Sequence, residues 1–533
     1  MKTCRTFCTA LLLTAVCTAS FSQPRRGMYD FQFIREDNPW LTSSNASGLG
    51  SLRADRTSYV AAAFSKDNGW LVGIDGSDNA LQAGICTESY VRISDRIAFS
   101  GKMAYKYTHW KNMGGPILLD PSYNPVNFYE DSPETTGTKN KEQYMVAGGV
   151  SYSFSREWAI GVKLDYEAAY GAKRKDPRFY NSWMDINVSL GGKFSPSEKF
   201  AVGADFLFRK TAETINADLF GLRDKKYFTF IDYGNFFGRR EGLEGSTGFI
   251  PINASQPMDN LFYGGAVQIE AGDRVKVFNE LAFTVRNGSY GKKSSSSVLF
   301  FEYGGYTLSY SGDLLIRNRA DNLHKVHLKA EYESIRTNEN IYRRTTPAGS
   351  ATVIEYFGQN EIQTRTAIKG NLSYTGYLGI ENFRSEWEYG INADFDYLSI
   401  LTTIYPHYRH HNVSCLAANV YGKKNFTVSD NIFTISLDGM FAMGFGTPAN
   451  DGSYSGSTSE APRSAETYLN RDFEYKTISR AGGMISFRYT RLFKRNFSIY
   501  TELCDKYVNT LKKPEFLGNG FRNSFTVTIG CAF

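Results

Sequence analysis

Apolar and polar residues alternate with a period of two along most of the chain. In one stretch the apolar positions run from Tyr144 to Phe154, and in another they run from Trp158 to Tyr166. Glycine, serine and charged residues fill the positions between them. A period of two predicts β-strands with one apolar and one polar face. Helical spacing does not compete over a comparable length, so we expect an all-β protein.

The expected strands are longer than those of soluble sheets. Many alternating stretches extend over about 12–15 residues, whereas strands of globular proteins most often have about 5–6. The apolar faces often begin or end in an aromatic residue, and Phe, Tyr and Trp make up 15% of the chain. These features are typical of transmembrane β-barrels, which have a lipid-facing outer surface, a wet lumen and aromatic girdles at both interfaces.

Short turns and long polar segments follow one another in turn along the sequence. The long segments are 111–142, 172–182, 213–260, 288–297, 337–351, 446–476 and 510–519. Tight turns at one end and long loops at the other are typical of barrels inserted into the outer membrane from the periplasm. Counting in this way predicts a closed antiparallel barrel over residues 57–533 with about 18 strands, or about 14–18 because 69–94 and 398–425 have unclear boundaries.

Residues 1–22 are predicted to be a secretory signal peptide that is cleaved at Ser22/Gln23. The alternative is a lipoprotein anchored at Cys17, although Val16 is a poor residue before that cleavage site. No later stretch approaches the roughly 18 apolar residues of a membrane-spanning helix. The cysteines after the signal are widely separated, which predicts neither a disulfide framework nor a metal site. They are Cys86, Cys415, Cys504 and Cys531.

Residues 23–56 lack the alternation and are expected to lie outside the barrel wall. The favoured interpretation is a periplasmic lead-in that fixes the first strand. The other is a hatch folded into the lumen, because a barrel of about 18 strands has room for one. The candidate hatch residues are Asn38, Pro39, Trp40 and Leu41.

Two short motifs carry family resemblances. The stretch REDNPWLTSSNASGL at 35–49, followed by a glycine-rich barrel that ends in Phe533, resembles a family of Bacteroidota outer-membrane β-barrel proteins whose function is not established. Its Asn-Pro start is also similar to that of fatty-acid-transporter-like barrels, although NPW replaces their NPA. The tail resembles the signal that the barrel-assembly machinery reads, which implies insertion into the Gram-negative outer membrane. The residues that would carry this signal are Phe525, Val527, Ile529 and Phe533.

No group of residues predicts catalysis, a metal site or a cofactor. The histidine cluster PHYRHHN at 406–412 places His407 and His411 on one strand face but far apart along it. The motif GSYSG at 452–456 lacks the central serine of a hydrolase elbow, because Tyr454 stands there. The net charge of +6 is spread along the chain and gives no support for a nucleic-acid partner.

Charged residues of both signs fall on the expected lumen faces. They would either pair across strands within the wall or tune the selectivity of a channel. The acidic group at 386–396 would give the lining a negative bias. The candidate lining residues are Glu386, Glu388, Asp394, Asp396, Arg480 and Arg488.

Together these patterns predict an outer-membrane barrel that is surrounded by lipid, passes or transports a solute and has no catalytic activity. The alternative is a scaffold barrel in a surface or secretion complex, with 213–260 and 446–476 as the surface for a protein partner. The final segment NSFTVTIGCAF at 523–533 is expected to close the barrel by pairing with 59–64 and with 497–509.

Overall fold

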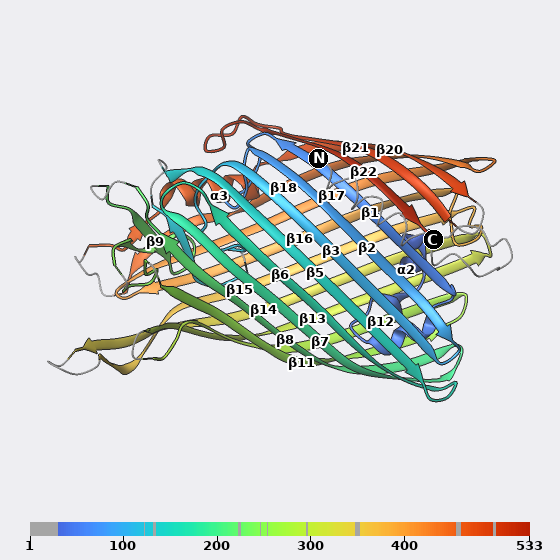
Figure 1. Cartoon of the computed structure of the whole chain (residues 1–533), viewed down its shortest axis with the longest axis horizontal. Coiled ribbons are helices and arrows are strands. Elements are labelled where there is room, and N and C mark those ends of the chain that lie inside the picture. The colour runs from blue at the N-terminus through green and yellow to red at the C-terminus, as the bar shows by residue number, and fades with distance from the viewer. Residues whose placement is uncertain are drawn as a thin grey trace, which may run out of the picture.

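The computed structural model describes residues 30–121, 123–131, 135–221, 225–245, 247–252, 254–294, 297–346, 352–454, 460–493 and 497–533. Among these residues, 18 strands form one closed antiparallel barrel (Figure 1), which confirms the predicted fold class and strand number. The predicted signal peptide at 1–22 and its cleavage site at Ser22/Gln23 lie outside the described residues.

The barrel strands follow one another in chain order around the wall. They are β1 (Arg56–Asn68), β2 (Asn79–Ser94), β3 (Ile97–Met113), β5 (Gly137–Ser153), β6 (Trp158–Lys173), β7 (Arg178–Ser197), β8 (Phe200–Asp218), β11 (Ser255–Gly272), β12 (Val275–Gly291), β13 (Leu299–Arg319), β14 (Asn322–Thr345), β15 (Val353–Leu378), β16 (Trp387–Ile404), β17 (His407–Val428), β18 (Asn431–Ser453), β20 (Arg480–Phe493), β21 (Phe497–Thr510) and β22 (Phe521–Ala532). The two regions with unclear boundaries, 69–94 and 398–425, therefore each keep their strands.

The last strand closes the barrel as expected. Strand β22 pairs with β1 from Tyr59↔Ala532 onwards and with β21 from Ser498↔Ala532 onwards. The backbone groups of Ser58 and Phe533 exchange two hydrogen bonds of 2.9 Å. Both edges of the tail are thus satisfied. Its role as an insertion signal stays a prediction.

The outward side chains form an apolar belt around the barrel. On β6, Trp158 is 55% exposed and Leu164 is 45% exposed. Trp158 packs on Phe194 at one rim with ring centroids 4.5 Å apart, and Tyr105 packs on Tyr144 near the middle of their strands at 5.0 Å. A continuous apolar surface of this kind is not a feature of proteins surrounded by water. The period of two in the sequence therefore arises because successive side chains point alternately to this belt and to the lumen.

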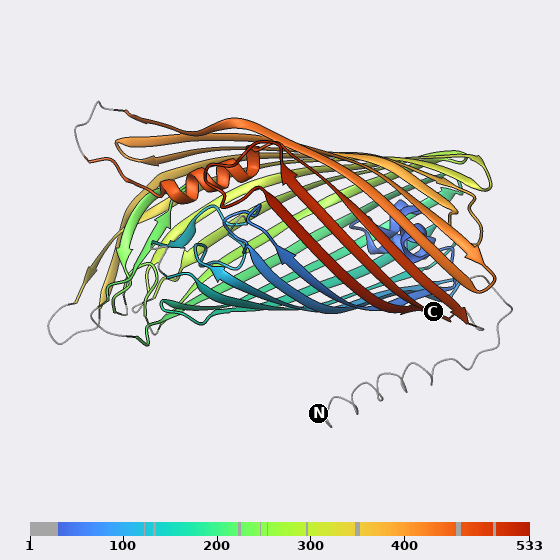
Figure 2. The same ribbon diagram turned by 90° about the horizontal axis from the view of Figure 1, so that it is seen from above.

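Residues 30–55 fold inside the barrel, at the end that holds the C-terminus (Figure 2). They contain the helix α2 (Phe31–Glu36) and the 3-10 turns η1 (Pro39–Leu41) and η2 (Ala46–Ser51). Each element begins at an Asp or Asn whose side chain accepts a backbone N–H: Asp30, Asn38 and Asn45. We call residues 30–55 the hatch. The favoured expectation of a lead-in outside the lumen is wrong for these residues, because short capped turns let the chain pack within the wall.

A second structure fills the other end of the lumen. It is a four-stranded sheet of β4 (Asn127–Glu130), β9 (Phe228–Asp232), β10 (Phe237–Gly242) and β19 (Arg463–Ser464), together with the helix α3 (Glu466–Thr477). We call these elements the lid; Figure 2 shows α3 and the hatch at opposite ends of the barrel. In the helix α3, Leu469 alone is buried. Without an apolar stripe, this helix leaves no helical period in the sequence.

Candidate functional site

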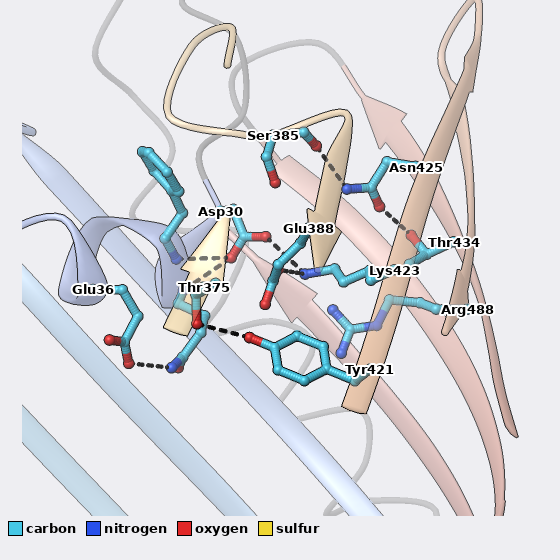
Figure 3. Close-up of polar contacts among 12 residues, drawn as sticks. Asp30, Glu36, Thr375, Ser385, Glu388, Tyr421, Lys423, Asn425, Thr434 and Arg488 are labelled. Carbon is cyan, nitrogen blue, oxygen red and sulfur yellow. Dashed lines mark hydrogen bonds and ion pairs between the residues drawn. The ribbon is translucent and has the colours of Figure 1, made fainter. Parts of the chain in front are cut away.

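The helix of the hatch is tied to the wall by ion pairs. Asp30 lies 3.6 Å from the ammonium group of Lys423 on β17, which also contacts Glu388 of β16 at 3.0 Å (Figure 3). Burial alone would raise the pKa of Asp30, but Lys423 and the N–H of Phe33 outweigh burial and lower it. Asp30 is therefore held in its charged form.

Two further acidic residues of the hatch reach the neighbouring strands. Glu36 pairs with Lys325 of β14 at 2.7 Å. Asp37 is buried between Arg317 of β13 and Arg53 of the hatch itself, at 3.2 Å from the latter. These pairs, with that of Asp30, spread the attachment of α2 over β13, β14 and β17.

The turn η2 packs directly against glycines on the inner face of the wall. A Cβ atom on Gly161 would lie 2.2 Å from the backbone nitrogen of Ser47, and one on Gly191 would lie 2.1 Å from Oδ1 of Asn45. Real Cβ atoms do not approach so closely, so the turn fits only against bare backbone. The wall sequence is thus matched to the hatch.

A buried polar network fixes the tip of the hatch. Asn45 donates to the carbonyl of Gly192 at 2.9 Å and to Oε1 of Gln268 at 3.0 Å. The amide nitrogen of Gln268 donates to Asp205 at 2.6 Å and to Glu280 at 3.0 Å. Since unpaired buried polar groups are costly, this network makes the docked position specific.

The candidate hatch residues hold the first 3-10 turn in place. Asn38 accepts the N–H of Trp40 at 3.3 Å and donates to the carbonyl of Ser51 at 2.9 Å. Trp40 is 2% exposed, packs edge-on against Phe278 and lies under the ammonium group of Lys193 at 4.3 Å. Pro39 and Leu41 are also buried. All four therefore lie in the lumen.

The lid is fastened by one arginine of β17. The Arg409 side chain is 2% exposed and donates two hydrogen bonds of 2.7 Å to the carboxylate of Asp451. It also donates to the hydroxyl of Ser464 in β19 at 2.8 Å. Its guanidinium thus joins the wall to the lid.

A hydrophobic core backs the lid against β7, β8, β11–β13 and β15. Ile231 and Tyr233 pack there with Tyr290 and Phe301 of the wall, and all four are at most 1% exposed. Next to this core, burial raises the pKa of Asp232 to about 7, although the N–H groups of Gly234, Phe236 and Phe237 oppose the rise. The lid is therefore a packed structure rather than a set of solvated loops.

The candidate lining residues are mostly paired. Asp394 accepts from Asn371 at 2.6 Å and from Asn392 at 2.7 Å. Arg488 donates to Glu502 at 2.9 Å, and its side chain keeps 42% exposure towards the lumen.

The remaining lining candidates take three different positions. Arg480 donates to the carbonyl of Tyr475 at the end of α3, at 2.5 Å. Asp396 lies opposite Lys369 in the strand register. Glu386 precedes β16 and pairs with Lys424, which covers the outward ring of Trp387. Glu386 thus belongs to the rim, and the acidic stretch does not form one uniform lining.

A cavity of about 420 Å³ lies between the hatch and strands β2–β8. Arg35, Trp40 and Leu41 of the hatch line it, together with Lys102 and Glu167 of the wall. A second cavity, of about 390 Å³, lies beside the segment 116–121 near the lid. The lumen therefore keeps space between its two closures.

The sequence did not reveal the polar contacts that hold the hatch and the lid in place. Asp37, Asn45, Gln268 and Arg409 carry them. Asp37 and Asn45 lie within the stretch 35–49 and Arg409 lies within the histidine cluster 406–412, but neither motif indicated these contacts. The spacing of Asp30, Asn38 and Asn45 before short turns was a usable signal for local structure, because Asx residues favour turn starts. Their distant partners left no trace in the sequence.

Neither a metal site nor a membrane-spanning helix is found among the described residues. The described residues contain no group of three or more His, Cys, Asp and Glu side chains arranged to hold a metal ion. His410 and His411 occupy opposite faces of β17, where they contact Ser399 and the carbonyl of Pro448. Within the described part of the chain, no helix is both long and apolar enough to cross a membrane.

Comparison with known proteins gives a family but no assigned activity. The model of a family of unknown function (DUF6850) matches residues 46–533. None of the curated proteins matches the sequence.

Several solved outer-membrane proteins are similar in architecture at low identity. The ferric preacinetobactin receptor BauA of Acinetobacter baumannii has 9% identity and a TM-score of 0.37, over 89% of this chain and 80% of that one. The import receptor Fiu of E. coli K12 has 8% identity and a TM-score of 0.39, over 89% and 81%. The toluene transporter TodX of Pseudomonas putida has 7% identity and a TM-score of 0.31, over 95% and 94%.

Proposed function

This chain belongs to the DUF6850 family of unknown function, and we propose that its barrel passes a solute across the outer membrane through a lumen gated by the hatch and the lid. The observation that carries the proposal is a lumen that is lined by charged side chains and keeps cavities beside its two internal closures. The proposal assigns no catalytic activity and no cofactor to the chain.

The outer belt supports a place in a bilayer. Its apolar residues alternate with lumen-facing ones, and the aromatic pair Trp158–Phe194 lies at one of its edges. Closure of the sheet through β22 and β1 leaves no backbone edge towards lipid. The short turns and the C-terminus would face the periplasm, so the hatch would close the periplasmic end.

The lumen between the closures supports passage. Lys163 and Arg209 face inward with 40% and 37% of their side chains exposed. Charged side chains at such exposure need water around them. A barrel whose lumen was filled only for support would gain more from apolar packing, as in the core of the lid.

The nature of the contacts supports gating. The helix of the hatch is held by ion pairs, and the lid by the hydrogen bond of Arg409 to Ser464 and by its core. These contacts join separate folded units to the wall, whereas the wall strands are paired along their length. The units can therefore leave the lumen while the barrel stays closed.

Conductance of planar bilayers tests the proposal. One variant loosens the hatch (Asp37→Asn with Trp40→Ala), one loosens the lid (Arg409→Gln), and a third combines them. We expect rare openings for the wild-type protein, more frequent ones for each single set and sustained conductance for the combination. Arg491→Gln, at an exposed rim pair, is the control. Heat-dependent mobility on gels verifies that each barrel is folded.

Folded barrels without conductance in all three variants would contradict passage and favour the scaffold alternative. A specific observation also favours that alternative. Strand β14 pairs with β13 as far as Glu339, and β15 pairs with β16 from Gln363. Beyond these residues the two strands form a hairpin that extends past the barrel (Figure 1), with Val353 51% and Phe357 59% exposed.

The hairpin provides a test for the scaffold. Shortening it between Asn340 and Asn360 should abolish copurification of a protein partner from native membranes and leave the conductance unchanged. The matched control replaces Arg343 and Glu355, an exposed ion pair at 3.1 Å, with alanine. A partner retained after shortening would argue against the hairpin as its contact surface.

A further inference from the structure

We propose that the cavity between the hatch and strands β2–β8 binds a small zwitterionic solute, an amino acid or a short peptide. Lys102 would hold the carboxylate of this solute and Glu167 its ammonium group. The inference rests on the proposed function, because it names the solute that the gated lumen would pass.

The cavity has the size and shape of a small-molecule site. Its volume of about 420 Å³ falls within the range of about 300–1,000 Å³ found for ligand pockets. Leu41 and Leu49 of the hatch form an apolar floor, and charged side chains from β2, β3, β6, β7 and β8 form the wall. A ligand there would contact the hatch and the wall at once.

Most charges around the cavity already neutralise one another. Lys163 pairs with Asp165 at 3.3 Å. Arg209 donates two hydrogen bonds to the carboxylate of Asp185, at 2.9 and 2.7 Å. Arg35 lies 3.6 Å from Glu88. These pairs leave little net charge for attracting a simple anion or cation.

Two opposite charges form no ion pair within 4 Å among the described residues, although Glu167 also interacts at longer range with Arg209 and Lys141. Lys102 forms no ion pair with any residue that the structure describes, and Glu167 accepts only the neutral amide of Gln143, at 3.1 Å. Both belong to the cavity lining. A ligand with one carboxylate and one ammonium group would satisfy both, since charge-assisted hydrogen bonds are stronger than neutral ones.

In the strand register, β5 separates Lys102 from Glu167, and it places the small residue Ala147 next to Lys102. Lys102 of β3 lies opposite Ala147 of β5, and Ala147 lies opposite Asp165 of β6. Glu167 follows two positions later on the same face of β6. Ala147 and Met145 of β5 lie between the two groups, and both line the cavity.

The aromatic residues of the cavity favour charge recognition over sugar stacking. Trp40 is 2% exposed and Tyr90 is 5% exposed, and their rings pack against Phe278 and Phe31. Neither ring offers a free face to a sugar. The indole N–H of Trp40 is buried and has no hydrogen-bond acceptor among the described residues. This unpartnered donor on a cavity-lining side chain is a second sign that a ligand completes the site.

Calorimetry on the full chain in detergent tests the inference with three probes: leucyl-leucine, its N-acetyl derivative and its C-terminal amide. The wild-type protein should bind the zwitterion about tenfold more tightly than either blocked form, the effect of one charge-assisted hydrogen bond. Lys102→Gln should remove the preference over the amide alone. Glu167→Gln should remove the preference over the acetylated form alone.

The controls are Lys106→Gln and Glu331→Gln, which alter inward-facing charges outside the cavity. Both should keep the two preferences. Equal binding of all three probes by the wild-type protein, or loss of both preferences in either test variant, would overturn the inference. Conductance is measured separately. A conducting barrel without zwitterion preference contradicts the inference alone, and binding without conductance contradicts the proposed passage alone.

Discussion

The side-chain amide of Asn45, in the hatch, donates a 3.0 Å hydrogen bond to Gln268 of β11, 223 residues later in the chain. The two residues are 1% and 0% exposed. This contact and its neighbours fix how the hatch sits within a wall that is built from later parts of the sequence. The hatch and the wall therefore form one specific arrangement.

Replacing Asn45 by alanine should loosen the hatch and leave the barrel intact. The variant leaves Oε1 of Gln268 without a donor and removes the cap of η2, which costs about 1–3 kcal/mol. Hydrogen exchange of residues 38–51 should become faster, while that of β11 stays unchanged. Asn360→Ala, on the exposed hairpin, is the matched control. Equal exchange in both proteins would show that the buried contact does not hold the hatch.

Gly161→Ala should displace η2 by steric conflict. The new Cβ atom would lie 2.2 Å from the nitrogen of Ser47, so the turn must move away from the wall. Limited proteolysis should then cleave the hatch more rapidly. Gly422→Ala is the control, because no heavy atom lies within 4 Å of its Cβ position. An unchanged cleavage rate in the Gly161 variant would mean that close packing against this glycine does not hold the hatch in place.

Arg409→Gln should release the lid. The substitution removes the bond to Ser464 of the lid, together with the paired hydrogen bonds that hold the guanidinium against Asp451 of β18, a loss of about 1–3 kcal/mol of lid docking. Arg409→Lys keeps the charge but loses the planar fork, so its effect should be intermediate. Hydrogen exchange of β10 and α3 measures the change. Protection that stays at the wild-type level in both variants would assign the fastening to the hydrophobic core instead.

The lid should be less stable above pH 7 than at pH 5. Burial raises the pKa of Asp232 to about 7 from an ordinary value of 3.8, so the folded lid binds more protons than the open lid between these values. Stability therefore falls as the pH rises through this window and levels off above it. Asp232→Asn should remove the dependence.

Hydrogen exchange of β9 and β10, compared between wild type and the Asp232 variant at each pH, tests this prediction because intrinsic exchange rates cancel. The two proteins should differ little at pH 5, and the wild type should exchange faster at pH 8. A constant ratio across the range would contradict it.

The strands of the barrel wall were predictable because the alternation that defines them is a local property of the sequence. Each strand needs an apolar side towards the belt and a polar side towards the lumen, and this requirement repeats at every second residue within each barrel strand. The pairing of β22 with β1 and β21 followed from closure. The candidate hatch residues were also found, since Asn38 and Trp40 break the alternation. Their place in the lumen was left open, because a polar segment is compatible with either side of the rim.

The site itself was not predictable from local pattern. Asn45 and Gln268 contribute only neutral amides, Gly161 resembles any other small lumen residue, and the helix α3 has no apolar stripe. The sequence alone determined the barrel, its strand number and its two faces, because alternation acts between neighbours along one strand. The tertiary structure decided that the lumen is closed at both ends and which charges remain unpaired within it. Those properties arise from contacts between residues far apart in the chain, and the alternation of apolar and polar residues carries no information about such contacts.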